Sequence, residues 1–380
     1  MTWKSMVLAD ICTHIFAGGD VPKNSLSKYQ TEQYQIPIYA NGEKNKGLYG
    51  FTDIARVTKP SMTVSARGTI GYSEIRYEPF FPIVRLIVLT PNEEIVQLEY
   101  LKYVLKSIDF KNSGTSIPQL TVPMIKKYEC KVPSLETQKQ IVAKLDQAFA
   151  EIEKAKVNAE QNLKNARELF QSLSLQAFSN HGNDWSIKPL GEVVVVERGS
   201  SPRPIKKYQT DNENGVNWIK IGDTKEGAKY VESTKEKITP EGAKKSRFVD
   251  IGDFILSNSM SFGRPYIMKI QGYIHDGWFV LRLPESIDTN YFYHLLSSPY
   301  LMEQFQSLAS GSVVKNISGD LVKKAILPIP PFDEQKRIAD ELEQLSQQIA
   351  QLQNIYKRKL DSLNELKQFI LQKAFKGELT

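Results

Sequence analysis

The chain has 380 residues, of which 41% are hydrophobic and 24% are charged, a composition that can support buried cores in two domains. A net charge of +6 does not by itself identify a nucleic-acid-binding protein, and two cysteines exclude a disulfide-stapled scaffold. The sequence shows neither a signal-like leader nor an apolar run of membrane-spanning length. We therefore expect a soluble cytoplasmic protein without a membrane partner.

Residues 1–133 are expected to form a first mixed α/β domain. Short apolar runs predict strands at 62–65 and 81–88, and a helix is expected at about 95–108. The loops between them are rich in Gly, Asn, Ser and Lys, which is typical of surface connections. The excess of positive charge lies in this segment and in 181–330, whereas the rest of the chain is neutral.

Residues 134–180 are predicted to form one long helix. The segment begins after a proline, has an acidic residue in its first turn and contains hydrophobic residues at alternating spacings of four and three. Such a heptad pattern, sustained over about five heptads, indicates a coiled coil. The predicted positions of this first seam are Ile141, Leu145, Ile152, Leu169 and Leu173.

Residues 181–331 are expected to form a second mixed α/β domain, with strands at 218–221 and 254–257 and a helix at about 289–306. Residues 332–380 then predict a second long helix with the same heptad spacing. Its seam positions are Ile338, Leu342, Leu345, Ile349, Leu352, Leu366 and Ile370. Asn162 and Lys359 share one seam position, which indicates either a register device or a solvated stretch of seam.

An internal repeat relates the two halves at an offset of 197 residues. It aligns the helix start at 132–141 with 329–338, Ser113-Gly114-Thr115 with 310–312, and 176–178 with 373–375. Short connections between the second domain and both helices require the helices to be antiparallel. The predicted fold is therefore α+β, with two mixed α/β domains separated by two long antiparallel helices that form a coiled coil with pseudo-two-fold symmetry.

No catalytic or metal-binding motif stands out in the sequence. The four histidines are far apart, and no glycine-rich nucleotide loop opens a helix. His275-Asp276 is interpreted as a turn pair beside a buried strand in preference to a catalytic pair. The joint absence of these motifs favours a binding protein that is not an enzyme and holds no metal or cofactor of its own.

Loops in both domains combine amides, cations and aromatic residues, which suit base edges and phosphates in DNA. A solvated loop remains the alternative for each single residue. The candidate DNA-binding residues are Asn41, Lys44, Lys46, Tyr49, Arg67, Thr69, Lys220, Asn258, Ser259, Arg264 and Lys315.

With these features in place, the chain resembles the specificity subunit of type I restriction–modification enzymes. The resemblance rests on the repeated P-x-(L/F)-(E/D)-x-Q-K-x-I helix start at 133–141 and 330–338, on the Ser-Gly elements, on 218–223 and on the Ala-Phe-Lys-Gly-Glu-Leu ending at 374–379. It covers the whole chain, and the set in this order is specific.

The resemblance implies two target-recognition domains that each read half of a bipartite, asymmetric double-stranded DNA site. It also implies two modification subunits as partners, which bind S-adenosylmethionine and methylate adenine, and restriction motor subunits that complete the nuclease. Since the family's DNA contacts vary, no residue role is carried over from it. A two-headed coiled-coil adaptor that binds only proteins is the alternative function.

Overall fold

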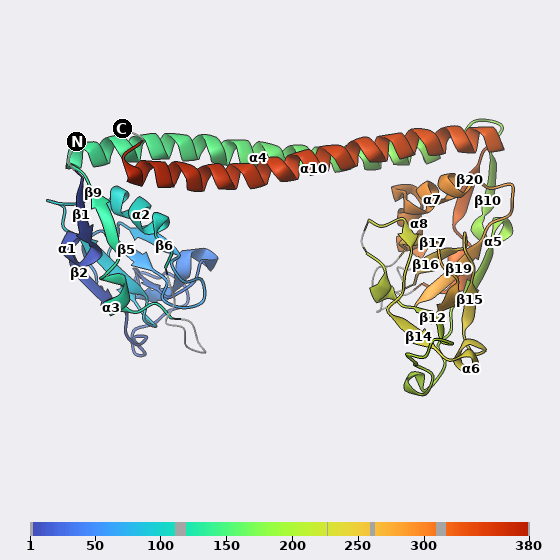
Figure 1. The fold of residues 1–380 in the computed structure, drawn as a ribbon, viewed down its shortest axis with the longest axis horizontal. Helices are drawn as coiled ribbons and strands as arrows, with labels where there is room; N and C mark the ends of the chain where they lie inside the picture. Colours follow the sequence, from blue (N-terminus) through green and yellow to red (C-terminus); the bar gives the residue numbers. More distant parts are fainter. Residues whose placement is uncertain (1–2, 111–118, 226, 259–262, 309–316, 379–380) are drawn as a thin grey trace. The chain divides into compact units, whose positions relative to one another are not determined.

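The computed structural model describes residues 3–110, 119–225, 227–258, 263–308 and 317–378, and it divides into two compact units. Unit 1 comprises Met1–Glu160 and Lys357–Thr380, and unit 2 comprises Gln161–Tyr356. Each unit contains a globular part with β-sheets and short helices, together with one end of each of two long helices (Figure 1). No helix among the described residues is both long enough and apolar enough to span a membrane.

Unit 1 is built on an antiparallel four-stranded sheet in the order β2-β8-β5-β6. Its strands are β2 (Cys12–Ala17), β8 (Ile87–Pro91), β5 (Ser61–Val64) and β6 (Ser73–Arg76). A second sheet, in the order β4-β3-β7, contains β4 (Leu48–Thr52), β3 (Ile36–Tyr39) and β7 (Phe81–Pro82). A separate antiparallel pair joins β1 (Lys4–Val7) to β9 (Glu129–Val132).

Three short helices complete the globular part of unit 1, and they are α1 (Leu8–Ile11), α2 (Leu98–Ser107) and α3 (Val122–Ile125). Helix α2 buries residues 100, 101, 104 and 105, the spacing of one helical face, against the four-stranded sheet. This face and the sheet form the core of unit 1, and the predicted helix at 95–108 is confirmed.

Unit 2 contains a five-stranded sheet in the order β11-β19-β16-β17-β13. Its strands are β11 (Val195–Arg198), β19 (Trp278–Arg282), β16 (Phe254–Ser257), β17 (Pro265–Met268) and β13 (Tyr230–Val231). The second sheet, β14-β12-β18-β15, contains β14 (Glu236–Ile238), β12 (Val216–Ile219), β18 (Gly272–Ile274) and β15 (Arg247–Val249). The pair β10 (Ser186–Pro189) and β20 (Ile326–Ile329) flanks the long helices in sequence.

The short helices of unit 2 are α5 (Leu190–Val193), α6 (Pro240–Ala243), α7 (Thr289–Ser297), α8 (Pro299–Leu308) and α9 (Gly319–Val322). The helix predicted at 289–306 is therefore two helices, α7 and α8. They are separated at Ser298, whose backbone is extended (φ −76°, ψ 153°) and which precedes Pro299. A residue before proline is disfavoured in the α conformation, so the break follows from the sequence.

The globular parts of the two units share one topology. The order β2-β8-β5-β6 in unit 1 corresponds to β11-β19-β16-β17 in unit 2. Strand β3 pairs parallel with β7 and antiparallel with β4, and β12 pairs in the same way with β18 and β14. Among the strands in the described residues, unit 2 adds β13 and β15 to this plan. The internal repeat therefore continues into the segments whose sequences align poorly.

The two long helices are α4 (Leu135–Ser179) and α10 (Phe332–Lys376), each of 45 residues. In unit 1, Ile141 near the start of α4 shares a core with Leu371 near the end of α10. In unit 2, Phe178 at the end of α4 shares a core with Ile338 near the start of α10. These opposite ends meet in each unit, and the predicted antiparallel pairing is confirmed.

The predicted heptad seam is only partly correct. Residues Ile141, Leu145, Ile152, Ile338, Leu342 and Ile349 are buried, and Leu345 and Ile370 are half-buried. The seam is wrong at Leu169, Leu173, Leu352 and Leu366, which are between 37% and 53% exposed.

The departure from the seam has a geometric cause. A straight α-helix drifts by about 20° per heptad from a strict seven-residue repeat, so the buried line moves onto other positions. In the unit 2 part of α4 the buried positions are Ala166, Ser174 and Phe178. Asn162 and Lys359 are both exposed, which supports the interpretation of a solvated stretch.

The repeated Pro-x-x-x-x-Gln helix start has the same structure in both units. The side chain of Gln138, fully buried, donates from Nε2 to the carbonyl oxygens of Ile95 and Pro133 (both 2.9 Å) and accepts the N–H of Gln97 (2.9 Å).

Gln335 repeats this arrangement in unit 2. It donates to the carbonyl oxygens of Ser286 (3.2 Å) and Pro330 (3.0 Å) and accepts the N–H of Asp288 (2.8 Å). The glutamine of the motif therefore fastens the start of each long helix to the loop that precedes α2 or α7.

Candidate nucleic-acid interface

In unit 1 three loops meet around Asn41, and they are the loop after β3, the loop after β5 and the turn between β7 and β8. Asn41 donates from Nδ2 to the carbonyl oxygen of Val84 (2.6 Å) and accepts the N–H of Ala66 on Oδ1 (2.7 Å). The neighbouring Gly42 N–H donates to Ser65 Oγ (3.0 Å). Asn41, a predicted DNA contact, thus joins the three loops, and its side-chain donor and acceptor are both engaged within the protein.

Arg67 and Arg85 converge on one acceptor in this cluster. Half-buried Arg67 donates to Gln119 Oε1 from Nε (3.3 Å) and Nη2 (2.8 Å), and Nη1 of exposed Arg85 lies 3.5 Å from the same oxygen. Among the described residues, no carboxylate forms an ion pair with either guanidinium. Thr69, also a predicted contact, is exposed in the loop that carries Arg67.

Arg85 and Gln119 were not among the predicted contacts. Arg85 was expected inside a strand, and nothing in the sequence around Gln119 links it to Arg67, which is 52 positions away. Their role follows only from the tertiary fold.

The remaining predicted residues of unit 1 lie on the exposed 3₁₀ turn and strand that follow β3. Lys44 and Tyr49 are exposed, and Lys46 lies 3.4 Å from Glu74. Buried Arg76 supports this turn because it donates to the carbonyl oxygen of Lys46 (2.5 Å) and lies over the ring of Tyr39. The turn that carries the exposed lysines is therefore held in place by the buried side chain of Arg76.

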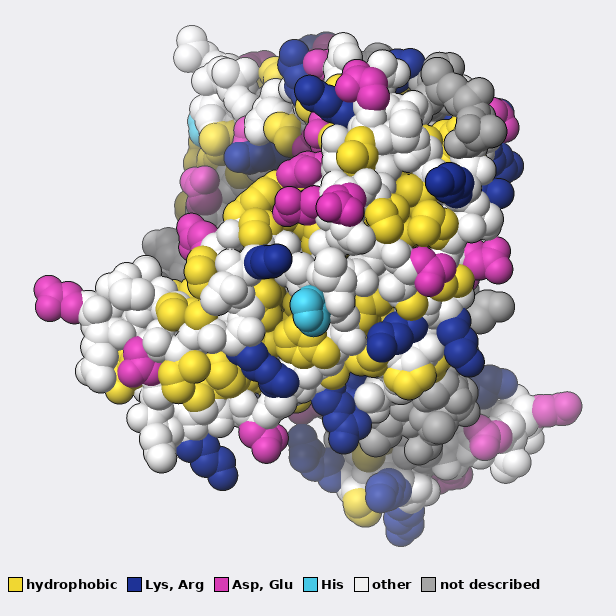
Figure 2. Space-filling model, turned by 90° about the vertical axis from the view of Figure 1, so that its left-hand side faces the viewer, with side chains coloured by type: hydrophobic (Ala, Val, Ile, Leu, Met, Phe, Trp, Pro, Cys, Tyr) yellow, Lys and Arg dark blue, Asp and Glu magenta, His cyan; other side chains and the backbone are white. Residues whose placement is uncertain are grey.

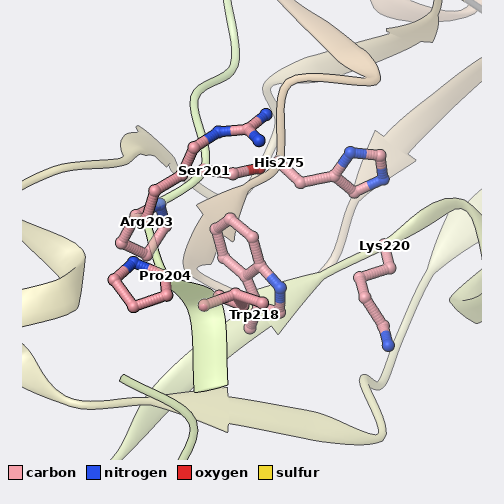
Figure 3. A pocket seen from close by; sticks show the side chains of 8 residues that line it. Ser201, Arg203, Pro204, Trp218, Lys220 and His275 are labelled. Atoms are coloured by element: carbon pink, nitrogen blue, oxygen red, sulfur yellow. The ribbon is translucent and has the colours of Figure 1, made fainter. Parts of the chain in front are cut away.

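In unit 2 a cavity of about 550 Å³ lies beside β12, where its apolar walls are Pro202, Pro204, Ile205 and Trp218. Figure 3 shows Arg203 on one side of the Trp218 ring and Lys220 on the other. Lys220, a predicted contact, is half-buried and its ammonium group pairs with the carboxylate of Glu236. Hydrogen bonding from Lys220 is the largest cause that lowers the pKa of Glu236.

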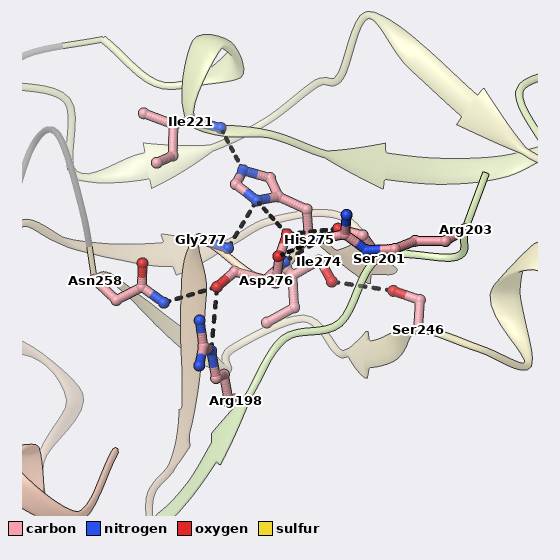
Figure 4. A network of polar contacts seen from close by, with 10 residues as sticks. All are labelled: Arg198, Ser201, Arg203, Ile221, Ser246, Asn258, Ile274, His275, Asp276 and Gly277. Carbon is pink, nitrogen blue, oxygen red and sulfur yellow. Dashed lines mark hydrogen bonds and ion pairs between the residues drawn. The ribbon is translucent and has the colours of Figure 1, made fainter. Parts of the chain in front are cut away.

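Behind this cavity, the turn between β18 and β19 is held by a polar network (Figure 4). The carboxylate of Asp276 accepts from Ser201 Oγ (2.6 Å) and from Arg203 Nη2 (3.3 Å). The carbonyl oxygen of Asp276 accepts from Asn258 Nδ2 (2.7 Å), and Arg198 Nε lies 3.4 Å from it. Asn258 is thus buried with its donor engaged inside the protein.

The arrangement around His275 is that of a turn and not of a catalytic triad. Ser201 donates to Asp276, whereas the His275 ring nitrogens face the backbone N–H groups of Ile221 (3.2 Å) and Gly277 (2.8 Å). A neutral imidazole can accept one such bond and a protonated imidazole none. The expected turn pair is confirmed.

The other predicted residues of unit 2 are Arg264, Ser259 and Lys315. Arg264 is half-buried, and its backbone N–H donates to Ser257 Oγ (3.2 Å). Ser259 and Lys315 lie outside the described residues, as do both Ser-Gly elements. On the face that Figure 2 shows, Lys and Arg side chains are interspersed with Asp, Glu and hydrophobic ones. The described residues on this face therefore form no continuous basic patch.

Two histidines, half-buried His275 and buried His294, make unit 2 sensitive to acid. Burial is the largest cause that lowers the pKa of His275 and of His294 from their ordinary value. Because the folded-state pKa lies below the unfolded one, the unfolded chain binds protons more readily. The stabilisation is therefore complete above the unfolded pKa of about 6.5 and is lost as pH falls toward the folded pKa.

We expect the free energy of unfolding of unit 2 to decrease between pH 7 and pH 5.5, measured by urea titration with tryptophan fluorescence. Three of the four tryptophans, Trp185, Trp218 and Trp278, belong to unit 2. His294→Gln should flatten this dependence. A decrease that is as steep in the variant would contradict the assignment to this histidine.

A family model described as the type I restriction modification DNA specificity domain matches residues 1–161 and again 182–359. A putative type I specificity subunit of Mycoplasma pneumoniae, S.MpnORF89P, is 38% identical over 147 residues, which are 39% of this chain and 43% of the relative. The chain thus spans less than half of that relative. The StySPI specificity subunit of Salmonella potsdam is 23% identical over 424 aligned residues, which cover 100% of this chain and 89% of that one.

Two solved structures share the fold. A chain from a structural study of complex assembly and conformational transition of the type I R-M system has a TM-score of 0.79 at 21% identity, covering 99% of this chain and 98% of that chain. The HsdS subunit from Thermoanaerobacter tengcongensis has a TM-score of 0.63 at 21% identity, covering 99% and 97%. Since the family model matches both halves of the sequence, the chain belongs to the type I restriction–modification DNA specificity family, the non-catalytic specificity subunits of these enzymes.

Proposed function

We propose that this chain reads a bipartite, asymmetric DNA site within a type I restriction–modification complex, with one half-site read by each unit. The observation that carries the proposal is the cluster of Asn41, Arg67, Arg85 and Gln119, in which two guanidiniums without an ion-pair partner among the described residues share one amide oxygen. Arginine is suited to the O6 and N7 acceptors of guanine, and nearby lysines are suited to phosphates.

The two half-sites differ under this proposal. The corner between the second and first sheets is topologically equivalent in the two units, yet it carries Val84 and Arg85 in unit 1 and His275 and Asp276 in unit 2. Arg85 is an exposed cation, whereas Asp276 is half-buried and its carboxylate is engaged by Ser201 and Arg203, so the two corners present different chemistry to base edges. This difference supports an asymmetric target.

The long helices supply a docking surface for the partner modification subunits. The unit 1 parts of α4 and α10 leave Val157, Leu366 and Phe369 exposed. In unit 2 the two helices border a groove of about 400 Å³, whose lining includes Leu173, Leu342 and Leu345. Exposed apolar groups of this kind are typical of surfaces that a partner helix covers.

The rest of the assembly is inferred from the family. The modification subunits would bring S-adenosylmethionine and methylate adenine, restriction motor subunits would complete the nuclease, and the complex would act in the cytoplasm. This chain would contribute target choice and no cofactor of its own.

Replacing Lys44, Lys46 and Arg67 together by Ala should weaken DNA binding by the complex assembled with its modification subunits. The slope of log affinity against log salt should decrease by up to about two, roughly one unit for each of the two lysines that contacts a phosphate. Any altered base preference should be confined to one half-site in sites selected from a random library. The measurement is a salt series of gel shifts followed by sequencing of the selected DNA.

The matched control replaces three other exposed cations of unit 1, Lys126, Lys127 and Lys131, by Ala. It should leave both the salt slope and the selected sites unchanged. Equal loss of specificity in both half-sites would contradict the proposal that one unit reads one half-site. An assembled complex that binds no DNA at all would favour the protein-adaptor alternative.

A further inference from the structure

The connection between β7 and β8 is a two-residue turn with an unusual backbone. Val84 (φ 51°) and Arg85 (φ 62°) both have positive φ, and the N–H of Leu86 donates to the carbonyl oxygen of Ile83 (3.0 Å). This is the pattern of a type I′ turn, which here joins strands of two different sheets. The sequence prediction of a continuous strand at 81–88 is therefore wrong, because Val-Arg carries none of the usual signals of such a turn.

Type I′ turns strongly prefer Asn-Gly or Asp-Gly at the two central positions, since a positive φ brings a branched side chain against its own backbone. Valine in this conformation is an outlier. The turn is fixed from outside, because the carbonyl oxygens of Gly19 and Gly18 accept the N–H groups of Val84 (2.8 Å) and Arg85 (3.0 Å). A sequence that works against its local structure indicates a functional constraint on these two side chains.

The turn presents an apolar group beside cations. Val84 is 47% exposed, and Arg85 is exposed next to it. Gln119 orients both Arg85 and Arg67, and Asn41 holds the carbonyl oxygen of Val84. Hence an exposed isopropyl group and two oriented guanidiniums lie on one rigid support.

The equivalent corner of unit 2 presents different chemistry. There the turn between β18 and β19 contains half-buried His275 and Asp276, whose carbonyl oxygen is held by Asn258 (2.7 Å) as that of Val84 is held by Asn41 (Figure 4). Both units therefore use an asparagine amide to fix the same corner of the fold. The two asparagines come from non-equivalent loops, since Asn41 follows β3 and Asn258 follows β16, the counterpart of β5. The side chains that the corner presents differ as well.

We propose that the Val84-Arg85 turn reads a thymine next to a guanine in the half-site of unit 1. In the major groove Val84 contacts the thymine 5-methyl group, while Arg85 and Arg67 face the guanine O6 and N7 acceptors. Because a methyl contact requires an apolar side chain at the surface, the strained valine is retained in place of asparagine. This inference rests on the proposed function and names which bases the unit 1 cluster recognises.

The test is the double variant V84N/R85G, which installs the preferred sequence of a type I′ turn. Thermal unfolding should show that the variant is more stable than the parent chain. Sites selected from a random DNA library by the complex assembled with its modification subunits should lose the thymine and the guanine in one half-site only. Replacement of that thymine by uracil should weaken DNA binding by the parent complex about fourfold, the value of one buried methyl group. The same replacement should not change the affinity of the complex that carries V84N/R85G.

Several results would overturn this inference. It fails if the parent complex selects no thymine in the half-site that the Arg67→Ala variant alters, or if it binds uracil as tightly as thymine. It also fails if V84N/R85G is more stable than the parent chain but selects the same bases. In that case the proposed function would still hold, provided that Arg67→Ala alters one half-site. If neither variant alters a half-site, both proposals fall together. Lys127→Asn, a cation removed from another turn of unit 1, is the control that should leave selection unchanged.

Discussion

Replacing Phe178 by Ala is expected to lower the free energy of unfolding of unit 2 by about 3–5 kcal/mol, the usual cost of truncating a fully buried phenylalanine. Phe178 is fully buried at the end of α4 and packs edge-on against Tyr291 of α7, with ring centroids 5.6 Å apart. Ile338 and Leu342 of α10 belong to the same core. Removal of the ring would therefore loosen three helices at once.

Denaturant titration followed by tryptophan fluorescence measures this loss. The matched control is Phe332→Ala at the start of α10 in unit 2, because that ring is 40% exposed and its removal leaves no buried cavity. The control should cost much less than Phe178→Ala. If both variants lost the same free energy of unfolding, the core of unit 2 would not depend on the end of α4.

The same design recurs at the other end of the sequence. Phe375 near the end of α10 packs edge-on against Tyr100 of α2 in unit 1, with centroids 5.5 Å apart. The Ala-Phe pairs at 177–178 and 374–375 were recognised as part of the repeat from the sequence alone. The sequence alone does not show that these residues pack into the cores at the helix ends. The reason is that α10, which completes the core of unit 1, begins more than two hundred residues after the four-stranded sheet of that unit.

The helices were more predictable than the globular parts. An uninterrupted heptad pattern with start signals fixes both the existence and the ends of a long helix, so α4 and α10 have the lengths expected. Which seam residues are buried depends on the drift of a straight helix against a seven-residue repeat. For this reason Leu169 and Leu366 were assigned to the seam and are exposed.

The site was less predictable because its contacts join distant segments. The loop at 41–47 could be proposed from its composition. The contact between Arg67 and Gln119 could not, because these two residues are 52 positions apart in the sequence. The turn at Val84 was missed because its two central residues have the propensity of a strand. Places where local sequence preference fails are expected to be functional ones, and this turn is such a place.

The glutamine of the repeated helix start gives the second large expected effect. Gln138→Leu should lower the stability of unit 1 by about 2–4 kcal/mol, since it leaves the carbonyl oxygens of Ile95 and Pro133 and the N–H of Gln97 without their partner. Gln335→Leu should do the same to unit 2. Hydrogen exchange resolved by peptide, covering α2 and α7, would assign each loss to its own unit.

Gln140→Leu is the control, because it makes the same chemical change on an exposed face of α4 and should be close to neutral. The position of Gln138 also separates stability from recognition. It is fully buried, and its partners Ile95, Gln97 and Pro133 lie outside the loops proposed to contact DNA. The folded fraction of Gln138→Leu should therefore select the same DNA sites as the parent chain. An altered half-site would mean that the start of α4 also positions the reading loops, so that the motif serves recognition as well as folding.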